Sequence, residues 1–176
     1  MPSKPKKGNK GKAAKGNNNN AEKEKKPGSD PLLLYTTYAN FSKIIGLEPN
    51  EHVKKSLTTD LEHNPHVGKQ ILIDGSESSF GPGGCRALAT ALLGRGKGMP
   101  TLSTESEQQP IIYTALQELR IWKDSIGDDG TMAIAEILRL GGAELQLSYL
   151  ELINNNIGAN GAKSLGRSLS FGVRAQ

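Results

Sequence analysis

The stretch LSYLELINNNIGANGAKSLGRSL, residues 147–169, decides the fold. Its first half alternates leucine with other residues, which is typical of a strand with one buried side. Its second half spaces small and apolar residues by three and four, which is typical of a helix. The positions that carry the pattern are Leu147, Leu150, Leu152, Asn155, Ile157, Gly158, Gly161, Ala162, Leu165 and Leu169. The stretch therefore predicts a short strand followed by a helix.

The same pattern occurs 31 residues earlier, in residues 116–138. Apolar residues and glycines return at every matching place except Thr131. The matching set is Leu116, Leu119, Ile121, Asp124, Ile126, Gly127, Gly130, Thr131, Ile134 and Leu138. A third, weaker copy has Ile71 and Ile73 as its strand residues, then two additional residues, and then Phe80, Gly81, Gly84, Cys85, Leu88 and Leu92. The sequence therefore predicts about three strand–helix units, the first of them irregular.

Recurrence at fixed offsets indicates units that stack, because one strand–helix unit cannot bury both of its apolar faces alone. In the last unit we expect Leu150 and Leu152 to point inwards. The buried face of its helix is expected to include Ala162, Leu165 and Leu169. Four glycines are expected to let the chain turn tightly from strand to helix, namely Gly127, Gly130, Gly158 and Gly161.

The pattern LxxLxLxxNxIGxxGAxxLxxxL resembles the leucine-rich repeat family, in the longer, helix-containing subclass typified by ribonuclease inhibitor and NLR proteins. Residues 116–138 depart from it at Asp124, where the family has an asparagine whose amide ties neighbouring turns together. A carboxylate cannot donate a hydrogen bond, so we expect a locally weaker ladder. The resemblance implies an α/β fold, a short right-handed solenoid with parallel strands on the concave side and helices on the convex side. The basic leader, the helical cap and LRIWK, residues 119–123, give a weaker resemblance to ciliary and centrosomal leucine-rich repeat proteins.

Composition divides the chain into four parts. Residues 1–30 are rich in lysine, glycine and asparagine and have no large apolar residue after the initiator, so we expect them to be disordered. Residues 31–66 predict a helical cap. Residues 67–170 hold the repeats, interrupted by an exposed loop at 94–110 that is rich in glycine, proline and polar residues. The remaining residues, 171–176, form a tail.

Two helices are expected in the cap. The first has Asp30 as its N-cap, Pro31 at its first position and Gly46 as its stop, and it places Leu34, Tyr38, Phe41 and Ile45 on one face. The second would start at Pro49, would bury Val53 and Leu57, and would end before Asn64 and Pro65.

Positive charge is concentrated in the leader. The chain has a net charge of +4, whereas residues 1–30 hold nine lysines against three acidic residues. Contacts with phosphate are the functional hypothesis for Lys4, Lys6, Lys7, Lys10, Lys12 and Lys15. Without arginine or aromatic residues the leader is not expected to read sequence, and a purely solubilising arm is the alternative.

The single cysteine and the lack of a signal peptide or an apolar run of about 18 residues indicate a soluble, intracellular, most simply cytoplasmic protein. The weaker resemblance suggests a cilium or the cytoskeleton instead. No contact with a membrane is expected.

Residues that alternate with the inward leucines should face out of the concave sheet. They form the predicted protein-binding site, Glu118, Arg120, Trp122, Tyr149, Glu151 and Ile153, to which the first unit would add Gln70, Leu72 and Asp74. Exposed aromatic residues are frequent interface anchors, which singles out Trp122. Two alternatives remain open: the cap or the long loop covers Trp122, and Arg120 merely pairs with Glu151 across adjacent strands.

Other chemistry finds little support in the residues. His63 and His66 lack a second pair of ligands at zinc spacing, and His52 is expected to be solvated. Lys97 is followed by Gly98, which does not fit a phosphate loop. Cys85 is expected to be a buried structural thiol, and Asp128 and Asp129 are expected to lie in an exposed turn.

The prediction is therefore a non-enzymatic adaptor without a cofactor or metal, which binds another protein on its concave face. A factor associated with nucleic acid or ribonucleoprotein, acting through the leader, is the alternative. Oligomerisation through an uncovered C-terminal repeat is a further expectation.

Overall fold

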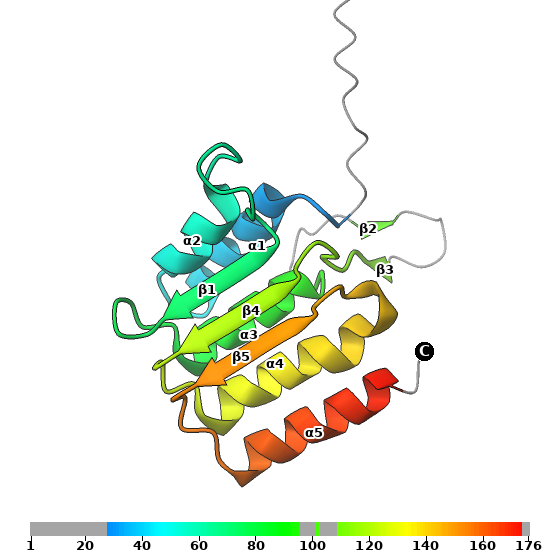
Figure 1. Cartoon of the computed structure of the whole chain (residues 1–176). Helices are drawn as coiled ribbons and strands as arrows, with labels where there is room; N and C mark the ends of the chain where they lie inside the picture. The colour runs from blue at the N-terminus through cyan, green and yellow to red at the C-terminus, as the bar shows by residue number, and fades with distance from the viewer. Residues whose placement is uncertain (1–27, 96–100, 103–108, 174–176) are drawn as a thin grey trace, which may run out of the picture.

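The computed structural model describes residues 28–95, 101–102 and 109–173 of the chain. Over these residues the fold is mixed α/β, with two helices first and strands alternating with helices afterwards (Figure 1). The elements are α1 (Pro31–Ile44), α2 (Glu51–Thr58), β1 (Gln70–Asp74), α3 (Gly81–Leu92), β2 (Thr101–Leu102), β3 (Gln109–Pro110), β4 (Glu118–Trp122), α4 (Gly127–Gly141), the 3-10 turn η1 (Gly142–Glu144), β5 (Tyr149–Ile153) and α5 (Ala159–Val173).

Three strands form one parallel sheet in the order β1-β4-β5. Leu119 pairs with Leu150 and Ile121 pairs with Leu152, so residues 31 positions apart in the sequence are direct neighbours in the sheet. Ile71 also pairs with Leu119, although these two residues are 48 positions apart, because the segment at 94–110 lies between their strands. The 31-residue offset that defines the repeat in the sequence is therefore the register of β4 on β5.

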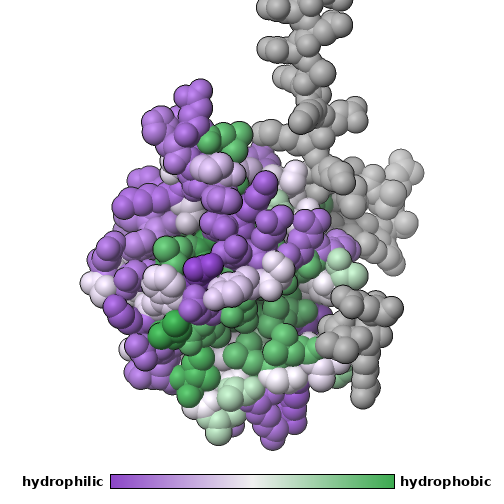
Figure 2. Space-filling view, viewed as in Figure 1, coloured by the Kyte–Doolittle hydropathy of each residue, from purple (hydrophilic) through white to green (hydrophobic). Residues whose placement is uncertain are grey.

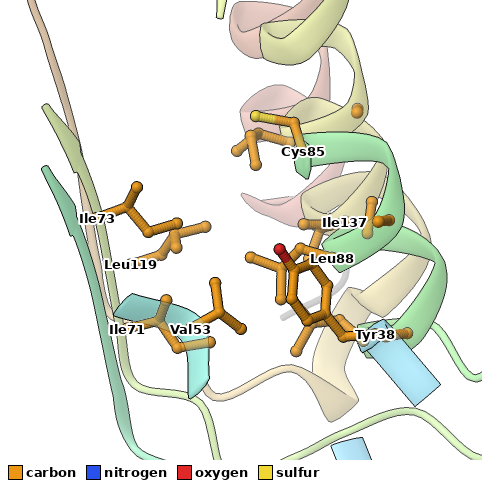
Figure 3. Packing of buried hydrophobic residues seen from close by; sticks show 14 of the residues in the cluster. Tyr38, Val53, Ile71, Ile73, Cys85, Leu88, Leu119 and Ile137 are labelled. Atoms are coloured by element: carbon orange, nitrogen blue, oxygen red, sulfur yellow. The ribbon is translucent and has the colours of Figure 1, made fainter. Parts of the chain in front are cut away.

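The core lies between this sheet and the helices that follow its strands. Ile71, Ile73 and Leu119 point from the strands towards Leu88 of α3 and Ile137 of α4 (Figure 3), and all five are at most 1% exposed. Burial of a side chain of this size contributes about 1.5–3 kcal/mol to stability. The predicted inward positions of the first two units are thus confirmed.

Polar side chains connect successive units at the strand-to-helix turns. The Asn155 amide donates to the Ile121 carbonyl at 2.7 Å, and its oxygen accepts from the Asp124 backbone N–H at 3.1 Å. Asp124 cannot donate, but its carboxylate accepts from the backbone N–H groups of Phe80 and Gly81 at 2.9 and 2.8 Å. The position at which a weaker ladder was expected therefore makes two hydrogen bonds. The positive end of the α3 dipole also stabilises the negative charge of Asp124.

Asp128 is a second connector. Its carboxylate accepts from the backbone N–H groups of Gly158 and Gly161 at 2.7 and 2.9 Å. The prediction that Asp128 lies in an exposed turn is wrong, because this side chain bridges to the next unit and is half-buried; Asp129 is exposed as expected.

Only one of the four predicted turn glycines needs a left-handed backbone. Gly127 has φ +59, while Gly130, Gly158 and Gly161 do not have positive φ. A Cβ added to Gly130 would lie 2.7 Å from the Ile126 Cβ, and one added to Gly161 would lie 2.8 Å from an Asp128 oxygen. Gly130 and Gly161 therefore permit close packing between neighbouring units. The spacing of glycines in the sequence does not distinguish this role from that of a tight turn.

The cap begins as predicted. The Asp30 carboxylate accepts from the Leu32 N–H at 3.0 Å, with Pro31 in the first turn. Leu34 and Tyr38 are buried, but Ile45 is 40% exposed, because it follows the last helical residue and no longer shares the face of α1.

The predicted start of the second helix at Pro49 is wrong by two residues. Asn50 is the N-cap, since its side-chain oxygen accepts from the N–H groups of His52 and Val53, and proline has no side-chain acceptor. Val53 and Leu57 are buried as predicted. The cap lies against β1 and α3, at the end of the sheet away from β5 (Figure 1).

The region predicted as a loop, residues 94–110, contains a small antiparallel pair. Thr101 pairs with Pro110 and Leu102 pairs with Gln109. Gly94 is buried rather than exposed, because its backbone packs against Ile111. The rest of this region, from 96 to 100 and from 103 to 108, lies outside the described residues.

The prediction of a buried face on α5 is largely wrong. Ala162 and Leu169 are exposed, the latter to 57%, and Leu165 is only partly buried. The counterparts of Ala162 and Leu165 in α4, Thr131 and Ile134, are fully buried because α5 packs over α4, and Leu138, the counterpart of Leu169, is half-buried. Among the described residues, no element packs over α5 in turn.

Candidate protein-binding face

The residues that alternate with the core positions of the strands form one surface, here called the outer sheet face. Parallel pairing in register arranges them in three rows of three. The rows are Gln70, Glu118 and Tyr149; Leu72, Arg120 and Glu151; and Asp74, Trp122 and Ile153. The structure thus brings together every residue of the predicted protein-binding site.

Arg120 is the electrostatic centre of the outer sheet face. Its Nη2 lies 3.0 Å from a Glu118 oxygen, and its Nε lies 3.9 Å from a Glu151 oxygen. Its Cζ lies 4.6 Å from the centroid of the Tyr149 ring. The predicted pair with Glu151 is present but is the longer of the two. Each of these partly exposed contacts contributes about 0–1 kcal/mol, so their main effect is to hold Arg120 in place.

Apolar side chains flank this charged centre. Ile153 and Tyr149 are 45% and 44% exposed, and Leu72 is exposed to a similar degree. Trp122 is half-buried, and its indole N–H is buried with no hydrogen-bond partner among the described residues. Trp122 is therefore neither fully exposed nor fully covered, and the predicted anchor retains part of its surface.

Hydrophobic surface is unevenly distributed over this side of the molecule. In Figure 2 it gathers over β5 and between β5 and α5, whereas the surface over the cap is mostly hydrophilic. The large exposed apolar residues of this region are Tyr149, Ile153, Leu169 and Phe171. The apolar area thus extends from the outer sheet face to the last helix.

A groove on the helix side was not anticipated from the sequence. Its volume is about 690 Å³, and it lies between the end of α1 and the outer sides of α3 and α4. Ile45, Leu47 and Met132 give it an apolar lining. Two ion pairs border it, Arg86 with Asp129 at 3.5 Å and Arg95 with Glu136 at 3.1 Å. The partners in each pair are more than 40 residues apart in the sequence, so only the tertiary structure brings them together.

Cys85 is fully buried, and the thiol is a packing group. Desolvation raises the pKa of the Cys85 thiol, and the Asp124 charge raises it further. A Cβ added to Gly130 would lie 3.2 Å from its sulfur. The prediction of a buried structural thiol is confirmed.

The histidines are dispersed. His63 and His66 are exposed in the segment after α2, and within the described part of the chain no three His, Cys, Asp or Glu side chains converge as metal ligands would. The expectation of a solvated His52 is wrong, because its ring is 15% exposed and its Nε2 lies 3.3 Å from Glu77.

All six predicted phosphate contacts lie outside the described residues, and so does Lys97. They are Lys4, Lys6, Lys7, Lys10, Lys12 and Lys15. None of the helices in the described ranges is long and apolar enough to cross a membrane.

No model of a known protein family matches this chain, and no curated protein sequence matches it. The functional argument therefore rests on the geometry of the chain itself.

Proposed function

We propose that this chain is a non-enzymatic binding module of the leucine-rich repeat type, which holds another protein against its outer sheet face. The single observation that carries the proposal is the row of Trp122 and Ile153 beside Arg120 and Tyr149 on a parallel sheet. In the solenoid that the repeat pattern implies, this face is the concave one. The parallel register at 31 residues and the Asn155 hydrogen bonds support that assignment.

The face has the composition of an interface centre. Aromatic residues and arginine are enriched where binding energy is concentrated, and they are most effective when already fixed in position. Arg120 is held by two carboxylates and a ring, so that little conformational entropy remains to be lost on binding.

Charge indicates the chemistry of the partner. On the outer sheet face Asp74, Glu118 and Glu151 face the single cation Arg120, which leaves an excess of negative charge. A partner segment that offers a large apolar side chain towards Trp122 and Ile153, and a basic side chain near Glu151, complements this arrangement. Such a module uses no cofactor and acts in the cytoplasm, or at a cilium or the cytoskeleton.

Trp122→Ala tests the proposal. Full-length protein would be used to capture partners from nuclease-treated cell extract, and bound proteins would be identified by mass spectrometry. The expected result is a set of proteins that wild type retains and Trp122→Ala loses, because the apolar anchor is gone.

Leu61→Ala is the matched control, since Leu61 is 70% exposed and lies outside the outer sheet face. It should retain the same proteins. Circular dichroism melting must show that Trp122→Ala still folds; loss of folding would make Trp122 a core residue. Equal capture by both variants would contradict the proposed site.

Binding of nucleic acid through the leader remains the second candidate, favoured by its charge excess. Deletion of residues 1–27 spares the Asp30 cap of α1 and separates the two functions. Partner proteins should still bind the shortened chain, whereas nucleic acid retained through phosphate contacts should be lost.

A further inference from the structure

The last strand–helix unit has an apolar side that the described residues leave uncovered, here called the open end. It consists of Leu150 and Leu152 of β5 and of Ala162, Leu165, Gly166 and Leu169 of α5. Their counterparts in the preceding unit are Leu119, Ile121, Thr131, Ile134, Ala135 and Leu138. Five of these six counterparts are at most 1% exposed. The open end therefore has the side chains of an interior interface at an exterior position.

Backbone hydrogen bonding shows the same contrast. β4 pairs with β1 on one edge and with β5 on the other, whereas β5 pairs with β4 alone among the described strands. Between units, the Lys123 N–H donates to the Ile153 carbonyl, and the Asp124 N–H donates to the Asn155 side chain. The equivalent N–H groups of the last unit belong to Asn154 and Asn155. An occupant that supplies acceptors at these two places would continue an existing ladder.

The row of α5 that corresponds to the α5-facing row of α4 has no charged residue, whereas Lys163 and Arg167 lie at other exposed positions of the helix. α4 presents Asp128 and Thr131 to α5, and the matching residues of α5 are the small residues Ala159 and Ala162. A Cβ added to Gly166 would meet nothing within 4 Å. Small residues in this row permit a neighbouring helix to approach closely, as α5 approaches α4.

We propose that the open end binds a further strand–helix unit with the same repeat pattern, which adds a strand parallel to β5 and a helix against α5. The two interior interfaces of this chain are the pattern for that complex. If the added strand keeps the register of β4 on β5, its central residue lies beside Glu151, just as Arg120 of β4 does. A basic residue is therefore favoured at the centre of the added strand.

A second copy of this chain does not fit the same role. The end of the sheet that would have to stack on β5 is covered by α2, whose Val53 and Leu57 pack against the core. Two copies could meet only through β5 of each, in antiparallel fashion. Pairing centred on that strand would place Glu151 of one copy opposite Glu151 of the other, which is unfavourable.

The test extends the full-length chain with an additional copy of residues 143–173, inserted after residue 173 so that the 31-residue spacing is kept. The added copy is the probe for the occupant. We expect a higher urea midpoint of unfolding than in wild type. Hydrogen exchange of the β5 amides should slow by about tenfold or more, because their free edge becomes paired.

Leu169→Glu in the original α5 is the deciding variant. In the wild-type chain it should change stability little, because Leu169 is exposed. In the extended chain it should abolish the gain, because the charge would be buried against the added helix. A control extension with aspartate in place of its two inward strand leucines should give no gain.

An extended chain with unchanged unfolding midpoint and unprotected β5 amides would overturn the proposal. So would wild-type protein that sediments as a dimer and becomes monomeric with Leu169→Glu, since a second copy would then be the occupant. Binding of partners to the outer sheet face is measured separately, with Trp122→Ala. A negative result in that experiment would leave the result for the open end unaffected.

Discussion

At the scale of single residues, similar side chains have different roles according to the unit in which they lie. Asn155 and Asp124 occupy the same place in the pattern, yet one donates to the preceding strand and the other accepts from the start of α3. Asp124 is 7% exposed, so its hydrogen bonds offset the cost of burying a carboxylate.

Replacement of Asp124 should therefore be costly. Asp124→Ala leaves the N–H groups of Phe80 and Gly81 without their acceptor, and we expect a loss of about 1–3 kcal/mol in the free energy of unfolding. Asp124→Asn keeps one acceptor oxygen and should lose less. Asp129→Ala removes only an exposed contact with Arg86 and should change stability by less than about 1 kcal/mol. Urea denaturation measures all three, and equal stability of Asp124→Ala and wild type would refute the role of the carboxylate.

Cys85 predicts a dependence on alkaline pH. Burial raises the pKa of its thiol above the ordinary value of 9.0. Above that pH the unfolded chain releases the thiol proton while the folded chain keeps it, so the stability present at lower pH is progressively lost, by about 1.4 kcal/mol per pH unit.

Cys85→Ala should remove the decline that begins near pH 9. Burial also raises the pKa of Tyr38 and of Tyr113 from 10.0, so a decline at higher pH should remain. Urea midpoints measured from pH 7 to 11 give the comparison. An identical pH profile for both proteins would show that the thiol does not titrate differently on unfolding.

At the scale of elements, equivalent strands differ in how fully they are covered. β4 lies between β1 and β5, and its Leu119 is fully buried, whereas Leu150 of β5 is only partly buried. The repeat pattern treats these leucines as equal, because it records spacing and not the neighbours of a unit.

Truncation of the two leucines should reveal the difference. Leu119→Ala should cost about 2–5 kcal/mol, as truncation of a fully buried leucine does. Leu150→Ala should cost distinctly less, because part of its side chain is already in contact with solvent. Urea denaturation gives both values, and a Leu150→Ala variant as unstable as Leu119→Ala would indicate that the open end is covered in solution.

At the scale of the whole molecule, stability should decrease from the cap and central unit towards α5. The cap covers one end of the sheet, and α3 and α4 are each packed between neighbouring helices, whereas among the described elements α5 packs mainly against α4. Units of a stack are stabilised mainly by their nearest neighbours.

Hydrogen exchange followed by NMR should show this gradient. Amides of β4 and α4 should exchange only through global unfolding of the chain, which is the slowest process. Amides of α5 should exchange faster, through local unfolding of that helix. Uniform protection from α3 to α5 would mean that the chain opens as one cooperative unit, with no weaker end.

The candidate face was predictable because alternation and register are local properties. Leu119 and Ile121 fix the inward side of β4, so Arg120 and Trp122 must lie on the other side, and the 31-residue offset places Glu151 and Ile153 beside them. Which carboxylate Arg120 prefers, and how far Trp122 is covered, depend on side-chain positions that spacing does not encode.

The sequence by itself determined the alternation of strands and helices, the register of β5 on β4 and the inward residues of the strands, because these follow from periodicity along the chain. Only the tertiary structure decided where the pattern fails to be buried, as at Ala162 and Leu169, and which glycines separate helices instead of turning the chain. It also decided that Asp124 caps α3, across more than 40 residues of sequence. Burial and capping are properties of neighbours in space, and a periodic sequence specifies what each unit needs but not whether a neighbour is present to supply it.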